Sequence, residues 1–438
     1  MKYNVKNITS FLLISLLPQL SGFILLKVFT EHLTKEEYGL YSAFMAIPPL
    51  LSIFLSLQLH TSISRFYFDC EGEERKDLIG SILLSVLALS TIGSVLLLLL
   101  QAPLLQLLFG EKFEGYGSEF SIVILNSYVI TLIAGLNSIL IVTENGHKVL
   151  NRVAFTTLIL IVTQYFSVSH FDGGVFSILV VLLLINVVNL LFVVSQTRSD
   201  WDMRFDFSVV KETIKYSSPL VFHQVGGYLF NFSSVLVLTS RLTLGDVAMF
   251  AILFKLSSLL KIAVNSVNTA WQPTAFKKLR ENRKKGLAYI ERSFKDFTIF
   301  FIPVYIMLSL VISLVIIYLL PEDYATLVKY VPIALGAYLF KMIYSFNTTL
   351  LFFDKKTMLI PKVTLVAGAL NLASVYFLSV YLGYVAAIYS FIASLMFLAV
   401  FFTVYSKMIY GVTGALLNLA KVLVVVFITC SAILTLCF

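Results

Sequence analysis

Long apolar runs separated by short polar connectors fill this chain from its beginning to its end. Each run has roughly 17 to 25 residues, the length that an α-helix needs to cross a bilayer. A pattern of this kind predicts a polytopic helical membrane protein. Thirteen runs are expected to be spans: 8–31, 38–62, 78–101, 119–142, 153–169, 174–195, 217–239, 246–269, 297–319, 331–353, 359–381, 384–406 and 415–438.

Basic residues distinguish the two sides of this predicted topology. The amino end and alternate connectors carry most of the 32 Lys and Arg residues, whereas the opposite connectors carry only Lys35, Lys112, Arg241 and Lys329. Short connectors with excess Lys and Arg remain on the cytoplasmic side of a membrane. The amino terminus is therefore expected in the cytoplasm, with the multi-pass chain starting from that side.

The composition agrees with a membrane protein. Of 438 residues, 59% are hydrophobic and only 13% are charged, and a soluble protein of this size could not bury so much apolar surface. The net charge of +8 requires no nucleic-acid partner, because the topology places it beside an anionic inner leaflet. The basic connectors could contact lipid head groups, but setting the orientation is the simpler role.

A weak internal repeat suggests how the helices are grouped. A shift of 209 positions lays residues 32–41 over residues 241–250, between two apolar runs in each case. We expect two six-helix bundles, 1–200 and 201–411, related by a pseudo-two-fold axis along the membrane normal, as in transporters that work by alternating access. The segment 412–438 lies outside this scheme and is either an additional helix or an interfacial helix. The alternative to a true repeat is that two turns share a Leu-Thr and an acidic residue by chance.

Catalytic chemistry has little support in the sequence. No carboxylate lies well inside an expected span, the five histidines lack metal-ligand spacing, and no Gly-rich phosphate loop is present. Asp200-Trp201-Asp202 resembles the metal-binding Asp-x-Asp of glycosyltransferases, but its connector of about 20 residues is too short for a nucleotide-sugar domain. We expect no enzyme activity, no cofactor and no metal.

Positive charge inside the bilayer is the feature that points to a ligand. Lys255 and Lys341 each lie about ten residues from the outer end of an expected span. A lysine at a helix centre is costly and usually faces a polar cavity or a partner. Without intramembrane acids to pair with, the two lysines suggest an anion-attracting cavity, although a hydrogen-bonded structural role is the alternative.

Further cations extend this candidate site. Lys261 shares a helix face with Ser257, Asn265 and Asn268, and Lys27 either joins the cavity or extends to the interface while pairing with Glu31. Three asparagines inside expected spans are interpreted as hydrogen-bonding residues between helices. They are Asn231, Asn347 and Asn371.

The order of short motifs resembles a known family. The stretch 33–41 (LTKEEYGLY), Arg65-Phe66-Tyr67 and Ala270-Trp271-Gln272-Pro273 are similar to the Wzx-type O-antigen flippases. These are polysaccharide biosynthesis transporters of the multidrug/oligosaccharidyl-lipid/polysaccharide exporter superfamily. The resemblance covers the whole helix order.

The resemblance implies that an undecaprenyl-diphosphate-linked oligosaccharide moves from the cytoplasmic to the periplasmic leaflet of the bacterial inner membrane. Lipid-linked oligosaccharide and membrane lipids are then the ligands, with a polysaccharide polymerase and a chain-length regulator as candidate partners. Cationic side chains suit a diphosphate. Arg65 follows the family pattern and becomes a candidate substrate-binding residue, or else a positive-inside anchor.

Two departures and three rival functions qualify this hypothesis. First, the acidic residue that the family usually has shortly before Arg241 is missing, since Asn231-Phe232-Ser233-Ser234 precede this arginine. Second, the expected spans lack buried carboxylates, which puts coupling to a cation through an acidic site, as in drug exporters of the superfamily, in doubt. An O-antigen polymerase or ligase generally carries a larger outer loop than 102–118. A multidrug exporter of the same superfamily favours intramembrane acids, and a scaffold role would depend on the basic connector 270–296.

Overall fold

The computed structural model describes residues 5–436 apart from 144, 171–172, 355 and 413. All regular elements in this part of the chain are helices. Within the described residues, ten helical segments are long and apolar enough to cross a membrane, and eleven if the bent pair α10 and α11 is one span. The prediction of an all-helical polytopic membrane protein is therefore confirmed.

Two compact units make up the chain, Met1–Tyr228 and Leu229–Phe438. The first unit holds α1 (Val5–His32), α2 (Lys35–Met45), α3 (Ile47–Ser56), α4 (Thr61–Phe66), α5 (Gly72–Leu99), α6 (Gln101–Phe109), η1 (Glu111–Tyr116), α7 (Gly117–Val142), α8 (Gly146–His170), α9 (Gly174–Thr197), η2 (Arg198–Asp200) and most of α10 (Phe207–Asn231). The second unit holds α11 (Ser233–Arg241), α12 (Leu244–Glu281), α13 (Arg283–Leu319), η3 (Glu322–Tyr330), α14 (Val331–Phe353), α15 (Leu359–Leu382), α16 (Val385–Tyr410) and α17 (Gly414–Leu436). The division into halves at residue 200 stays a prediction.

Each of the thirteen expected apolar runs coincides with a helix or with a pair of consecutive helices. The predicted span 38–62 is interrupted, because Leu57 and Gln58 have positive φ angles of 44° and 56° and end α3. The predicted span 217–239 is bent by 53° between α10 and α11.

The basic segment 270–296, expected to be a connector, is a helical hairpin. Helix α12 continues to Glu281 with Pro273 inside it, and α13 begins at Arg283. Asn282 makes the turn, since its side chain accepts a hydrogen bond of 3.0 Å from the backbone N–H of Lys285 and so caps α13. The predicted span ends near residue 269, but the helix continues because Trp271, Ala275 and Leu279, four residues apart, are buried.

The repeat at an offset of 209 positions has a structural counterpart. Thr34 caps α2 by accepting the Glu37 N–H at 3.2 Å, and Thr243 caps α12 by accepting the Asp246 N–H at 3.2 Å. In both places the threonine hydroxyl also donates to the same carboxylate, at 3.0 Å and 2.7 Å. The shared Leu-Thr and acidic positions therefore encode the same helix start in each unit.

A second pair of positions follows the same offset. Gly174 starts α9 with φ +53°, and Gly383 precedes α16 with φ +59°. A Cβ added to Gly174 would lie 3.3 Å from Glu37 Oε1, and one added to Gly383 would lie 4.0 Å from Asp246 Oδ1. Each capping carboxylate thus lies near a glycine of positive φ in a later hairpin of its own unit. The correspondence spans two separate hairpins in each unit and so goes beyond a shared turn sequence.

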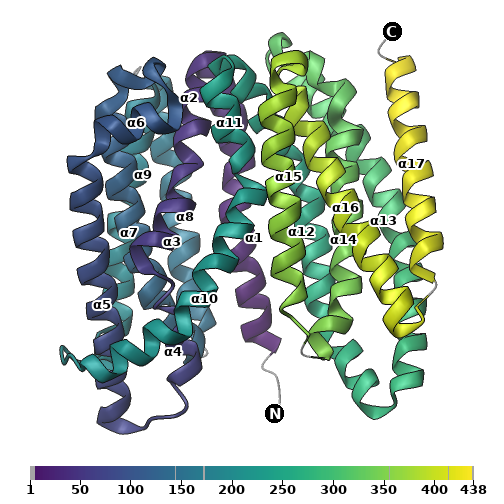
Figure 1. The fold of residues 1–438 in the computed structure, drawn as a ribbon. Helices are drawn as coiled ribbons and strands as arrows, with labels where there is room; N and C mark the ends of the chain where they lie inside the picture. The colour runs from purple at the N-terminus through teal and green to yellow at the C-terminus, as the bar shows by residue number, and fades with distance from the viewer. Residues whose placement is uncertain (1–4, 144, 171–172, 355, 413, 437–438) are drawn as a thin grey trace. The chain divides into compact units, whose positions relative to one another are not determined.

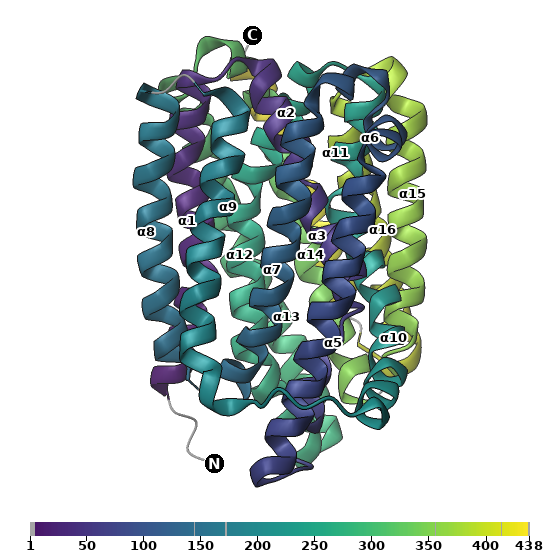
Figure 2. The ribbon, with the colours of Figure 1, turned by 90° about the vertical axis from the view of Figure 1, so that its left-hand side faces the viewer.

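Unit 1 packs α1 against α8, and α7 against α9 and α5 (Figure 2). A strap, residues 201–206, crosses α5 near its start. The Asp202 N–H donates to the Lys76 carbonyl at 3.4 Å, and Ser81 Oγ donates to the Arg204 carbonyl at 3.2 Å. The strap lies directly on the helix backbone at Gly80, where a Cβ would stand 1.8 Å from the Asp202 carbonyl oxygen.

In unit 2, α14 is the central helix. It packs against α16, α12 and α17, and α15 lies beside α16 (Figure 1). Most of α14 is buried, from Val331 to Leu351. An exposed ion pair joins the start of α13 to the end of α14, in which two guanidinium nitrogens of Arg283 donate to the Asp354 carboxylate at 3.0 Å and 2.9 Å. These hydrogen bonds lower the pKa of the Asp354 carboxyl.

Substituting Gly80 tests the seat of the strap. Gly80→Ala should destabilise the protein by ~1 to 3 kcal/mol, because the new methyl group must displace the strap backbone. The matched control is Gly115→Ala, where a Cβ meets nothing within 4 Å. The measurement is the thermal midpoint of the purified protein, and equal midpoints for the two variants would contradict the close approach of the strap.

Candidate functional site

Three lysines in unit 2 lie at membrane depth on neighbouring helices. Lys255 follows the start of α12 by eleven residues and Lys341 follows the start of α14 by ten, which corresponds to about 15 Å of helical rise. Half of a hydrocarbon core of about 30 Å is the same distance. Lys261 lies about six residues further along α12, and all three side chains are partly buried. We call these residues the lysine band.

The lysine band has few partners. Lys261 Nζ donates to Asn231 Oδ1 at the end of α10, 3.3 Å away. No hydrogen bond or ion pair joins Lys255 Nζ or Lys341 Nζ to another residue in the described chain. Lys341 and Lys261 are close enough to interact electrostatically, and because both are cations the interaction is repulsive. The band therefore presents positive charge that protein carboxylates do not neutralise.

Aromatic clusters lie on both sides of the lysine band along α12 and α14. One cluster is centred on Phe391 of α16, whose ring lies 5.2 Å from Phe254 and 5.7 Å from Tyr338. The other is centred on Phe346 of α14, whose ring lies 4.6 Å from Trp271 and 4.7 Å from Phe297. Along α14 the order is Tyr338, Lys341, Phe346, so packed aromatic rings lie on either side of the lysine.

The three intramembrane asparagines hydrogen-bond between helices, as predicted. Asn347 of α14 donates to Thr403 of α16 at 3.1 Å, and Asn371 of α15 donates to Ser234 of α11 at 3.4 Å. Asn231 accepts from Lys261, as described above. The asparagine at 231 therefore provides the polar contact to the lysine band where an acidic residue would provide a counter-charge.

The other two predicted site residues belong to unit 1, and each pairs with a nearby carboxylate. Lys27 Nζ lies 3.6 Å from Glu31, and Arg65 donates to Asp69 at 2.7 Å. Both cations are about half exposed. Lys27 fits the pairing that its spacing predicted, and Arg65 also lies against its neighbour Phe66, 5.3 Å from the ring. A role for either residue in substrate binding stays a prediction.

Unit 1 contains a buried cation that sequence reasoning missed. Arg152 lies near the start of α8 and is only 4% exposed. In the sequence it stands at the edge of a basic connector, where it counts simply as one of the residues that set orientation. Only the packing of α8 shows that its guanidinium points inward.

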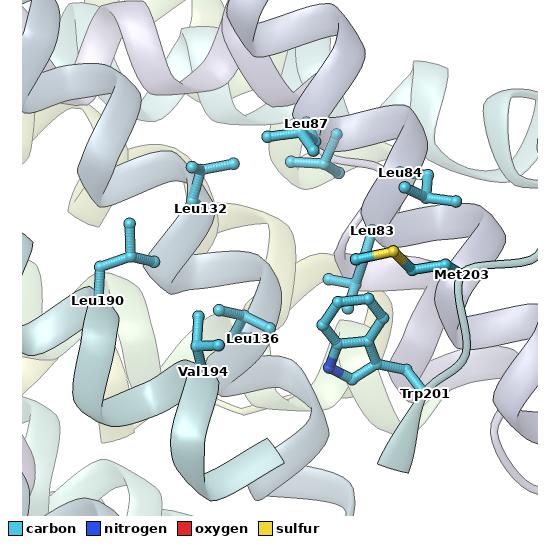
Figure 3. A pocket seen from close by; sticks show the side chains of 10 residues that line it. Leu83, Leu84, Leu87, Leu132, Leu136, Leu190, Val194, Trp201 and Met203 are labelled. Atoms are coloured by element: carbon cyan, nitrogen blue, oxygen red, sulfur yellow. The ribbon is translucent and has the colours of Figure 1, made fainter. Parts of the chain in front are cut away.

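An apolar cavity of ≈ 190 Å³ lies between α5, α7 and α9 of unit 1 (Figure 3). Trp201 and Met203 of the strap form one wall, facing Leu83 and Leu136. The Asp200-Trp201-Asp202 sequence thus anchors the strap and closes the cavity with its tryptophan. Among the residues that the structure describes, no group of three or more His, Cys, Asp or Glu side chains could hold a metal ion.

Comparison with known proteins identifies the family. Residues 4–279, well over half of the chain, match the family model described as "Polysaccharide biosynthesis protein". The chain belongs to the polysaccharide biosynthesis protein family. No match was found among curated protein sequences.

Solved structures similar to this family member establish its fold. An inward-facing multidrug resistance MATE family transporter of the MOP superfamily has a TM-score of 0.70 at 15% identity, covering 93% of this chain and 98% of that chain. The lipid II flippase MurJ, in an inward closed conformation, has a TM-score of 0.67 at 16% identity, covering 96% and 98%. A mutant of a Vibrio cholerae MATE transporter has a TM-score of 0.61 at 14% identity, covering 95% and 97%.

These comparisons give the chain a MATE and MurJ type of fold within a polysaccharide biosynthesis family. Both kinds of neighbour are transporters by name, one of drugs and one of a lipid-linked molecule. The fold does not by itself choose between such substrates. The choice depends on the side chains of the site.

The thermal stability of lysine variants tests whether the poorly paired charges of the lysine band destabilise the protein. Lys255→Met should raise the thermal midpoint, with stabilisation of about 1 kcal/mol or more, because it removes a poorly paired charge and keeps a long apolar side chain. Lys261→Met is the matched control and should raise the thermal midpoint by less, because it also removes the hydrogen bond that Lys261 donates to Asn231 Oδ1. A lower midpoint for Lys255→Met than for Lys261→Met would show that Lys255 has a stabilising partner.

Proposed function

We propose that this protein is a Wzx-type flippase that moves an undecaprenyl-diphosphate-linked oligosaccharide from the cytoplasmic to the periplasmic leaflet by alternating access. The proposed cargo is the repeat unit of an O-antigen or a related surface polysaccharide. The proposed location is the bacterial inner membrane, with the amino terminus in the cytoplasm. Family membership and the MurJ-like fold support transport of a lipid-linked sugar.

The observation that carries the proposal is the lysine band of unit 2. Lys255 and Lys341 lie near mid-membrane depth, and Lys261 lies within electrostatic range of Lys341. A diphosphate carries negative charge and several acceptor oxygens, so ammonium groups in a low-dielectric interior would bind it strongly. Lys27 and Arg65 are weaker candidates for binding the diphosphate, because each already pairs with a carboxylate.

The same observation separates this proposal from its rivals. A drug exporter for cationic compounds would need intramembrane acids, and the expected spans carry them only at their ends. A polymerase or ligase would need a catalytic pair on an outer loop, and the outer segment containing α6 and η1 is short. A polysaccharide polymerase and a chain-length regulator are proposed as partners rather than as activities of this chain.

The sidedness of the lipid-linked product tests the proposal in cells. Cells lacking the protein should accumulate single repeat units on the cytoplasmic face, measured with a periplasm-restricted sugar probe and normalised to total product. Single units that reach the periplasm but remain unpolymerised would instead identify a polymerase or ligase.

Variants of Lys341 extend the same assay. Lys341→Gln should reduce translocation roughly tenfold or more at equal protein level, because a charge-assisted contact to phosphate is lost. Lys341→Arg should retain more activity than Lys341→Gln. Equal activity of the Ala, Gln and Arg variants would contradict a role for the charge.

Asn231 offers a test that leaves the lysines in place. Asn231→Asp puts a carboxylate beside Lys261, so it should pair with the ammonium and reduce translocation of an anionic cargo several-fold. Asn231→Ala, which removes the contact without adding charge, is the matched control and should be milder. The charge account is wrong if Asn231→Ala is the more damaging substitution at equal protein level.

A further inference from the structure

A buried arginine in unit 1 lacks a carboxylate partner. Arg152 lies six residues into α8, about 9 Å along the helix from its first residue. The residue is buried, with only 4% of its surface exposed. None of the ion pairs among the described residues includes it.

The hydrogen bonds of Arg152 are incomplete. Its Nη2 donates to Asn137 Oδ1 of the neighbouring helix α7. Asn137 lies five residues before the end of α7, about 7.5 Å of rise, so the two side chains meet at the same depth. Arg152 Nε and Nη1 are buried without a hydrogen-bond partner in the described chain. At least three of the five guanidinium N–H donors therefore lack an acceptor among the described residues.

Such a group cannot remove its own charge. A lysine in this position could lose its proton, but an arginine remains protonated in proteins. Burying a charge without a counter-charge is strongly unfavourable. A water molecule or a backbone carbonyl would satisfy donors without balancing the charge, whereas an anion does both.

We propose that Arg152 and Asn137 form a binding site for a small inorganic anion of the size of chloride. The low exposure of Arg152 restricts the ligand to an ion that needs little more room than a water molecule, because a lipid head group could not reach the guanidinium. Asn137 holds one edge of the guanidinium through its carbonyl oxygen. The donors at Nε and Nη1 are left to bind the ion.

This site is separate from the lysine band, since it lies on α7 and α8 of unit 1 and the band lies on α12 and α14 of unit 2. It does not depend on the proposed cargo, because a counter-ion for Arg152 is required whatever the protein transports. The binding should stabilise the folded protein in proportion to the logarithm of the anion concentration once the site fills.

Thermal stability in matched salts tests the site on the purified full-length protein. Sodium chloride should raise the thermal midpoint above that in sodium gluconate at the same ionic strength, with a constant increment for each tenfold rise in chloride. Arg152→Gln should remove the chloride dependence. Arg204→Gln, at an exposed arginine paired with Asp77 at 3.1 Å, is the control and should retain it. Identical wild-type midpoints in the two salts would overturn the proposal.

A structural readout keeps the test independent of the stability of the variant. Bromide replaces chloride chemically and scatters X-rays anomalously, so crystals of the wild-type protein grown in bromide should show an anomalous peak beside Arg152 Nε and Nη1. Peaks confined to surface lysines, with none at Arg152, would mean adventitious ions only and would also overturn it. In Arg152→Lys the peak should weaken, because a single ammonium replaces two of the donor nitrogens.

Discussion

A positive charge held inside the bilayer must be met by something other than water, and much of this structure follows from that constraint. In unit 2, Asn231 accepts a hydrogen bond from Lys261 of the lysine band, and aromatic clusters around Phe346 and Phe391 lie on either side of the band. In unit 1, Arg152 donates one hydrogen bond to Asn137. Among the described residues, neither unit pairs Arg152 or the partly buried lysines of the band with a carboxylate. Cations kept in this state at a cost to stability are a common mark of a binding site.

The fold was largely predictable because a bilayer imposes few choices. Length and hydropathy placed a helix at every apolar run, since a lipid-exposed backbone must satisfy its own hydrogen bonds. What the pattern could not predict came from packing. The continuation of α12 through Pro273 depends on the burial of Trp271, and the break after α3 depends on left-handed Leu57 and Gln58. Gly80 gives no sign in the sequence that a strap will cross it.

The candidate site was predictable to a similar degree. Depth and charge selected Lys255, Lys341 and Lys261 without any knowledge of their neighbours, and the structure brings them to neighbouring helices of one unit. Their surroundings depend on contacts between distant segments, such as Asn231 with Lys261, which no local pattern encodes. Arg152 was missed because a basic residue at a connector edge looks like a topology signal. The repeat, by contrast, was visible as a weak match and proved to encode shared helix caps at Thr34 and Thr243.

The central claim is that the lysine band recognises the charge of a lipid diphosphate. The most direct measurement is equilibrium binding of undecaprenyl diphosphate and of uncharged undecaprenol to the purified protein, comparing wild type with a variant in which Lys255, Lys261 and Lys341 are all Gln. The account predicts that wild type binds the diphosphate more tightly, that raising the salt concentration narrows the difference, and that the variant binds the two lipids almost equally. A preference for the diphosphate that persists undiminished in the triple variant would contradict the account.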